Sequence, residues 1–317
     1  MTIQARVRRM LFMMASLALV IWPASAQTCS FAITDMVFDS DIDTLSGVPA
    51  TSNAELSYSC SGGSGSERIL ICAHLGAGSV EAGGNSRRML GGSSHLNYQL
   101  YQAGDYAVTW GSAATGNPPP PIALALDGGS GAGSRTIYGR VFGGQQTAAA
   151  ASYMSTFTGT DVEVRYRIAD DNDCSTMAGT QSSPVSFSVQ AGVKKNCLVS
   201  TEPVSFGEHG NLLSNIDATG MISVTCTPAT DYSIKLNGGN AATAPAARKM
   251  TMGAREITYG LYRDVARDEP WGDTEGTSKS DAGDGSGQPH VVYGRVPPQP
   301  TPKAGNYADV VVVTIDY

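Results

Sequence analysis

The sequence predicts an all-β protein made of two related β-sandwich domains. Charged residues make up only 15% of the 317 residues, and 37 residues are glycine. Short segments that alternate apolar and polar residues, such as 162–168 and 185–189, are separated by clusters of Gly, Pro, Asn and Asp. This pattern is typical of strands joined by turns. In addition, the same landmarks occur twice along the chain in the same order.

Residues 1–26 have the features of a signal peptide. Three arginines lie within residues 6–9, residues 10–22 are apolar, and Ala24-Ser25-Ala26 offers a small-x-small cleavage site. The apolar run of about 13 residues is shorter than the roughly 20 that a membrane-spanning helix needs. An uncleaved anchor is the alternative. We therefore expect an exported mature chain that begins at Gln27 and has no membrane span.

A duplication organises the rest of the chain. Residues 87–110 align without a gap with residues 248–271, and both segments contain Arg-x-Met, Tyr-x-Leu-Tyr and a tryptophan. A Tyr-Gly-Arg-Val motif follows in each, at 138–141 and 293–296. Each copy ends in an alternating segment that favours a strand. The repeat predicts one domain at residues 27–192 and a second at residues 193–317.

The six cysteines that follow the signal peptide favour disulfides, because an exported chain with an even number of cysteines usually pairs them. Cys29 and Cys60 are 31 residues apart, and Cys197 and Cys226 are 29 apart. The duplication makes these two pairs equivalent. Cys72 and Cys174 have no counterparts in the second copy, so they are expected to pair with each other. No C-x-x-C motif or zinc-like spacing is present.

Neither nucleic-acid binding nor catalysis is predicted. The formal net charge is −7 and no basic patch occurs, so an acidic surface would repel phosphates. The four histidines are scattered, and the sequence lacks G-x-S-x-G, H-E-x-x-H, P-loop and G-x-G-x-x-G motifs. The run Asp39-x-Asp41-x-Asp43 lacks the glycine and distal glutamate of a calcium loop. We expect no enzyme, no cofactor and no metal.

The C-terminal segment carries a family resemblance. Residues 305–317 read G-x-Y-x-D-x-V-x-V-x-I-x-Y, and Tyr-Gly-Leu-Tyr occupies 259–262. With the two early cysteines, this pattern resembles the spore coat protein U domain, the family of pilins in archaic, Csu-type chaperone–usher pili. The resemblance is strong over 197–317 and weaker over 29–168. It implies immunoglobulin-like sandwiches, of which the C-terminal one is an incomplete pilin fold that lacks its last strand.

The resemblance also implies partners. A periplasmic pilus chaperone would lend the missing strand, an outer-membrane usher would export the subunit, and the N-terminal donor strand of the next pilin would replace the chaperone. An unpaired strand edge is otherwise an aggregation hazard. The expected acceptor groove lies beside the alternating C-terminal residues Val311, Val313, Ile315 and Tyr317.

The first domain is expected to have no donor strand to offer, since only Gln27 and Thr28 precede Cys29 in the mature chain. Val185, Phe187 and Val189 instead alternate with polar residues just ahead of Cys197. We expect this segment to complete the first domain in cis. An ordinary final strand of a complete domain is the alternative, with the same consequence for assembly. A subunit that accepts a strand and offers none can only end the fibre. We therefore expect this protein at the tip of the pilus, at the cell surface.

The resemblance implies that such a tip adheres to abiotic or host surfaces through apolar loops and supports biofilm formation. The candidate loop residues are Pro118, Pro119, Pro120, Pro121, Ile122, Leu124, Ala148, Ala149, Ala150 and Ala151. A core strand at 122–126 and a tight connection at 148–151 are the alternatives. A glycan-binding, lectin-like adhesin that stacks aromatic rings on sugars, and a non-tip structural or matrix protein, are the other functions considered.

Overall fold

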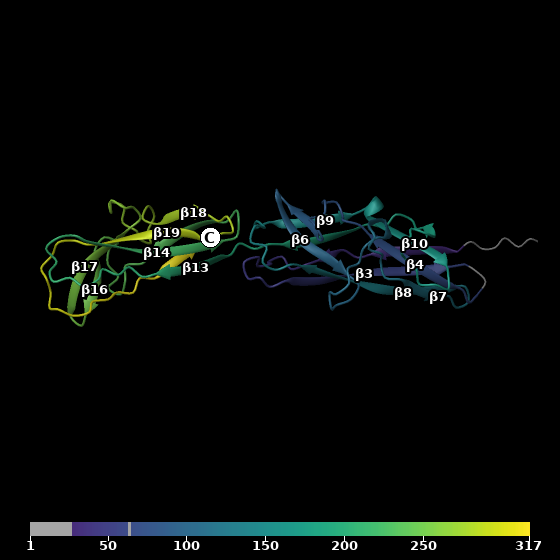
Figure 1. Ribbon diagram of the computed structural model, residues 1–317, viewed down its shortest axis with the longest axis horizontal. Coiled ribbons are helices and arrows are strands. Elements are labelled where there is room, and N and C mark those ends of the chain that lie inside the picture. The colour runs from purple at the N-terminus through teal and green to yellow at the C-terminus, as the bar shows by residue number, and fades with distance from the viewer. Residues whose placement is uncertain (1–26, 63–64) are drawn as a thin grey trace, which may run out of the picture.

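The computed structural model describes residues 27–62 and 65–317, and its strands form four sheets (Figure 1). Apart from the short 3-10 turns η1 (Ala113–Thr115) and η2 (Gly159–Asp161), its regular structure is all strand, as predicted. The predicted signal peptide lies outside the described residues. Two sheets lie within residues 28–192, called the first half below, and two within residues 197–317, the second half.

The first half is a sandwich of an eight-stranded and a four-stranded sheet. In spatial order the large sheet contains β1 (Thr28–Ile33), β3 (Ala50–Ser61), β8 (Ser130–Val141), β6 (Ser94–Tyr101), β5 (Arg87–Gly91), β9 (Ser152–Phe157), β12 (Phe187–Gly192) and β2 (Met36–Val37). The small sheet contains β11 (Thr180–Gln181), β10 (Val162–Ile168), β4 (Arg68–Leu75) and β7 (Ile122–Ala125).

The second half is a smaller sandwich of a five-stranded and a three-stranded sheet. The first contains β13 (Cys197–Glu202), β14 (Ile216–Cys226), β19 (Gln288–Val296), β17 (Arg255–Tyr262) and β16 (Arg248–Met252). The second contains β18 (Lys279–Ala282), β15 (Asp231–Leu236) and β20 (Val313–Asp316). The predicted strand at 310–317 is thus a strand only over its last part.

Period-2 alternation explains most of these strands, because successive side chains point to opposite faces of a sheet. In β10, Val162, Val164 and Tyr166 are buried while the residues between them are half-buried. Strand β4 is buried on both faces. Its Ile69 and Ile71 enter the main core, whereas Leu70 and Cys72 form a small cluster with Ala169 and Cys174 on the other side.

All three predicted disulfides are present in the structure. Cys29–Cys60 and Cys197–Cys226 each join directly paired residues of the first two long strands of a half, β1 with β3 and β13 with β14. Cys72–Cys174 joins β4 to the loop that follows β10. Each half therefore has the same bond at the same place, and the third bond belongs to the first half alone.

The glycine of the repeated Tyr-Gly-Arg-Val motif has the same role in both halves. A Cβ on Gly139 would lie 2.1 Å from Met36 Sδ, and a Cβ on Gly294 would lie 2.7 Å from Val204 Cγ1. The side chains that follow the first strand pack so closely on β8 or β19 that an added Cβ would displace them, and glycine permits this contact. This close approach places Met36 and Val204 in equivalent positions.

The two halves follow one another along the long axis of the molecule (Figure 1). Between them, the Ala150 N–H donates to the Pro228 carbonyl at 3.1 Å, and Asn196 Nδ2 donates to Asp43 Oδ2 at 2.8 Å. Val193 packs into the first core. The predicted boundary after residue 192 therefore lies one residue before the last side chain of that core.

Candidate functional site: an unfilled strand position in the second half

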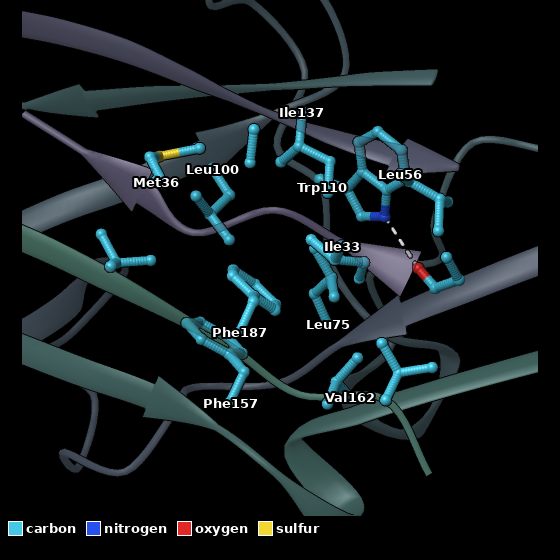
Figure 2. Packing of buried hydrophobic residues seen from close by; sticks show 14 of the residues in the cluster. Ile33, Met36, Leu56, Leu75, Leu100, Trp110, Ile137, Phe157, Val162 and Phe187 are labelled. Atoms are coloured by element: carbon cyan, nitrogen blue, oxygen red, sulfur yellow. Dashed lines mark hydrogen bonds between the residues drawn. The ribbon is translucent and has the colours of Figure 1, made fainter. Parts of the chain in front are cut away.

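The first half contains a strand that the second half lacks. Strand β12 pairs antiparallel with β9 and parallel with β2, and so joins β2 to the large sheet. Its Phe187 is 5% exposed and its Val189 is 0% exposed, and Val185 just before it is also buried. Phe187 stacks on Phe157 of β9 with ring centroids 4.4 Å apart, and Figure 2 shows both rings inside the core. The segment predicted as a donor strand in cis occupies the first core.

Two buried tryptophans establish which residues of the halves are equivalent. Trp110 Nε1 donates to the Ala73 carbonyl of β4 at 2.7 Å, and Trp271 Nε1 donates to the Ile234 carbonyl of β15 at 2.9 Å. Both indoles are fully buried and hydrogen-bonded, as such groups usually are. Trp110 and Trp271 therefore have structural roles, which argues against their stacking on a sugar.

Two buried arginines repeat the same equivalence. Arg87 Nη2 donates to the carbonyls of Leu75 and Trp110, both at 2.8 Å. Arg248 Nη2 donates to the carbonyls of Leu236 and Trp271, at 3.1 and 2.8 Å. Burial lowers the pKa of Arg87 to about 10 and also lowers the pKa of Arg248. Each guanidinium satisfies carbonyls at the end of a core strand, which a neutral side chain could not do as fully.

Equivalent positions differ in burial where β12 has no counterpart. Met36 and Phe38 are buried beside β12, but Val204 and Phe206, which follow Cys197 at the same spacing, are only half-buried. On the opposite side, Val311, Val313 and Ile315 are half-buried, Val310 is 64% exposed and Val312 is 53% exposed. Among the described residues of the second half, no strand lies between these two segments.

The open position corresponds to β12, because the segments on either side of it are equivalent to β2 and β9. In the first half, β12 hydrogen-bonds to both of those strands. In the second half, residues 309–312 form no strand, and β20 begins only at Val313, where β15 becomes its partner. The shortened strand thus results from the missing neighbour. An added strand would find apolar side chains on both walls.

The acceptor residues predicted from sequence differ in burial. Val311, Val313 and Ile315 pack against the second core, whereas Tyr317 is 55% exposed. Val204 and Phe206, on the opposite wall, were not predicted from the sequence. Their signal is the spacing from the cysteine: seven and nine residues separate them from Cys197, as they separate Met36 and Phe38 from Cys29.

The structure does not support the predicted apolar binding loops. Ile122 and Leu124 are buried in β7, which pairs with β4, so the alternative of a core strand describes them. The prolines before them divide into exposed Pro118 and Pro121 and buried Pro119 and Pro120. A period-2 apolar segment has the same sequence pattern whether its apolar face meets a core or solvent, so the sequence alone left both readings of Ile122 and Leu124 open.

The alanine run lies at the junction of the halves. Ala148 is fully buried in the first core, and Ala149, Ala150 and Ala151 are half-buried. The Ala150 backbone contacts Pro228 of the second half through a hydrogen bond. Small side chains allow this close approach, and the run is a tight connection rather than an exposed loop.

Two negative findings concern the described residues alone. Within 27–62 and 65–317, no three His, Cys, Asp or Glu side chains come together in a way that could hold a metal ion. Nor does this part of the chain contain a helix of the length and apolarity that a membrane span requires.

Comparison with known proteins assigns the chain to a family. A family model described as Spore Coat Protein U domain matches residues 15–160 and 183–314. Protein U of Myxococcus xanthus is 36% identical over 106 residues, which are 31% of this chain and 59% of that protein. The chain therefore spans about three-fifths of the length of this curated relative.

One solved structure that contains a pilus tip subunit has a similar fold. The CsuC–CsuE chaperone–tip adhesion subunit complex of archaic Csu pili from Acinetobacter baumannii matches with a TM-score of 0.53 and 14% identity over 92% of this chain and 100% of that chain. The CupB6 tip adhesin from Pseudomonas aeruginosa matches with a TM-score of 0.40 and 12% identity over 92% and 94%. The first match supports the immunoglobulin-like fold. The family and this fold are those of non-enzymatic subunits, as predicted from the sequence. Matched over both halves, the chain belongs to the Spore Coat Protein U domain family.

Proposed function

We propose that this protein is the tip subunit of a chaperone–usher pilus, and that its second half accepts a donor strand. The observation that carries the proposal is the contrast between the filled strand position of the first half and the open one of the second. An alternating strand in that position would bury Val204, Phe206 and Val311, as β12 buries Met36, Phe38 and Phe157. A strand added to an open edge in this way is β-augmentation.

The tip position follows from how the donor-like segment is used. Residues 185–193 have the alternating pattern of a donor, but their apolar side chains belong to the first core. Removing them would expose that core, so they are not free to complete a neighbour. A subunit with one open acceptor position and its own donor-like strand already in use ends a fibre rather than extending it.

The first half would then be the adhesive, distal domain (27–192), and the second the pilin-like domain (193–317). We propose that the protein passes through the periplasm with a pilus chaperone and is exported by an outer-membrane usher. At the cell surface it would mediate adhesion and biofilm formation. The chaperone-bound tip subunit among the structures of similar fold supports this route.

A donor-strand exchange experiment tests the proposal. The mature chain would be purified with its chaperone and mixed with a synthetic peptide copied from the N-terminal segment of a pilin of the same pilus. Release of the chaperone and a rise in melting temperature, with one peptide bound per chain, are expected. A protein that is already stable alone and exchanges no strand would contradict the proposal.

A pair of variants provides the matched control. Val311→Arg places a charge on the wall of the open position and should abolish peptide uptake. Val310→Arg changes the adjacent residue, which is 64% exposed, and should leave uptake unchanged. Equal uptake by both variants would place the peptide elsewhere on the molecule.

A further inference from the structure

Arg140, on the outer face of the first half, has no carboxylate partner. It lies on β8 directly opposite Thr51 of β3, and Thr51 is exposed. The Arg140 Nε is buried, yet no side chain or carbonyl of the described residues accepts a hydrogen bond from this guanidinium or pairs with its charge. Buried N–H groups are nearly always paired in proteins. Arg140 as a whole is half-buried, so a ligand would reach its guanidinium through the Nη groups rather than through the buried Nε.

The second half shows what normally satisfies this arginine. Arg295, the equivalent residue in the repeated Tyr-Gly-Arg-Val motif, lies opposite Asp217 of β14. Its Nε and Nη2 donate to the two oxygens of Asp217 at 2.8 and 2.9 Å, in the bidentate geometry that guanidinium and carboxylate favour. The first half has the same arginine at the same place, with Thr51 instead of the carboxylate.

One aromatic ring contacts Arg140 and two more lie near it. Its Cζ lies 5.6 Å from the centre of the Tyr106 ring, and Tyr106 contacts Tyr101 edge to face with centroids 5.4 Å apart. Tyr138, two residues before Arg140 on the same face of β8, is half-buried. Val108, in the same turn as Tyr106, is 56% exposed. The guanidinium thus has partly exposed rings beside it.

The turn that presents Tyr106 is the same in both halves. Tyr106 has φ 56° and its equivalent, Arg267, has φ 65°. Non-glycine residues adopt this left-handed conformation at a cost of about 1–2 kcal/mol, and here the fold imposes it twice. In the second half the residue is a second arginine, 3.3 Å from Asp217. In the first half it is a tyrosine, so the same turn presents an aromatic ring.

We propose that Arg140, Tyr106 and Tyr138 form a binding site for a sugar ring that carries one carboxylate, of the uronic acid type. The carboxylate would pair with the Arg140 guanidinium, as Asp217 pairs with Arg295 in the second half, and the pyranose ring would lie on the tyrosines, because aromatic faces bind the apolar face of sugars. Glu55 lies on β3, as Thr51 does, and Asp105 lies in the turn that contains Tyr106. Both are exposed, and neither pairs with Arg140. Their charges favour a ligand with a single carboxylate over a dense polyanion.

This inference goes beyond the proposed function and does not depend on the open strand position. The test uses the full mature chain, with its chaperone or a donor peptide bound, titrated separately with glucuronic acid, glucose and acetate by saturation-transfer NMR and calorimetry. Glucuronic acid should bind and glucose should not. Acetate should bind at least about tenfold more weakly than glucuronic acid, since charge-assisted hydrogen bonds provide only part of the affinity.

Four variants decide between the site and general charge attraction. Thr51→Asp should abolish binding, because it supplies internally the carboxylate that the second half already has, and Arg140→Ala should weaken binding at least about tenfold. Thr51→Val and Arg135→Ala, an exposed arginine on the same strand, should bind as the parent does. No binding of glucuronic acid by the parent, equal binding of acetate, or unchanged binding by Thr51→Asp would each overturn the proposal.

Discussion

The two halves of this protein have the same scaffold, yet equivalent residues differ in burial. Tyr166 of β10 is 8% exposed, whereas Tyr317, at the equivalent position beside β15, is 55% exposed. Phe157 stacks inside the first core, while the matching Val311 is half-buried. The tryptophans and arginines that identify the repeat are buried in both. Burial therefore differs at residues beside the β12 position, such as Phe157 and Val311, and is the same at the residues that identify the repeat.

This contrast shows that burial in a repeated fold is not a property of the repeat alone. The first half completes its core with a segment, 185–193, that lies outside the repeated landmarks. The second half has no such segment among its described residues, so its alternating C-terminal part lacks a neighbour on one side. Unpaired apolar strands favour association, and the two halves of one chain show where such an unpaired segment lies.

The largest expected effect comes from weakening the strand that fills the first core. Phe187→Ala should lower the free energy of unfolding of the first half by about 3–5 kcal/mol, because a buried stacked ring is removed. The second half should be unaffected. Trp110 and Trp271 each report one half, so urea unfolding of single-tryptophan variants separates the two transitions.

Ser188→Ala is the control for that experiment, since Ser188 is the neighbouring residue on the other face of β12 and should change stability little. A loss of stability shared equally by both halves would mean that they unfold as one unit. The filled strand position would then stabilise the whole chain and not the first half alone.

The converse experiment fills the open position. A peptide with the sequence of residues 184–193 should bind the second half and stabilise it by about 2.7 kcal/mol at one hundred times its dissociation constant. The reason is that the walls of the open position are equivalent to β2 and β9. The Trp271 transition should move to higher urea while the Trp110 transition stays in place. A peptide with Asp at the position of Phe187 is the control, and equal stabilisation by both peptides would contradict strand insertion.

The sequence predicted the repeated framework well because its signals are local or repeated. Cysteine spacing, the ungapped repeat and strand alternation led to the fold class and to all three disulfides. The role of Val185, Phe187 and Val189 in the first core followed from alternation and from their place before Cys197. These features depend on patterns that one chain can display twice.

Exposure could not be predicted in the same way. Ile122 and Leu124 alternate with alanines, and only the pairing of β7 with β4 decides that they face the core. Ala148 packs into the first core and the Ala150 N–H donates to the Pro228 carbonyl of the second half, and a run of small apolar residues specifies neither contact. The carboxylate missing opposite Arg140 depends on the cross-strand register of β3 and β8, which no spacing along the sequence specifies.

A pH effect is expected in both halves, and a buried histidine of the first half carries the larger one. His74 of β4 is 1% exposed, and its Nδ1 accepts a hydrogen bond from the Ala113 N–H, so the ring is held neutral. Burial, followed by the charge of Arg165, lowers the pKa of His74 to about 4. In the unfolded chain His74 binds a proton more readily than in the folded one. The free energy of unfolding of the first half is therefore highest above pH 6.5 and falls as the pH is lowered toward 4.

The loss should be on the order of 2 kcal/mol, and His74→Asn should remove most of it, since Asn keeps an acceptor without titrating in this range. The Trp110 transition at a series of pH values is the measurement. His290, in the second half, also has a lowered pKa because of its burial, so the Trp271 transition should fall in the same direction. A pH profile of the first half that is unchanged in His74→Asn would assign the effect to other groups.

The smallest effect concerns the pair that differs between the two Tyr-Gly-Arg-Val motifs. Asp217→Thr should lower the stability of the second half by about 1 kcal/mol or less, because exposed ion pairs contribute little, and Thr51→Asp should raise that of the first half by a similar amount. Opposite shifts of the Trp271 and Trp110 transitions, both reduced in high salt, are the expected result. If Thr51→Asp instead destabilised the first half, Arg140 would be unable to pair with a carboxylate at this position. The difference between the halves at this position would then be one of packing rather than of a missing charge partner.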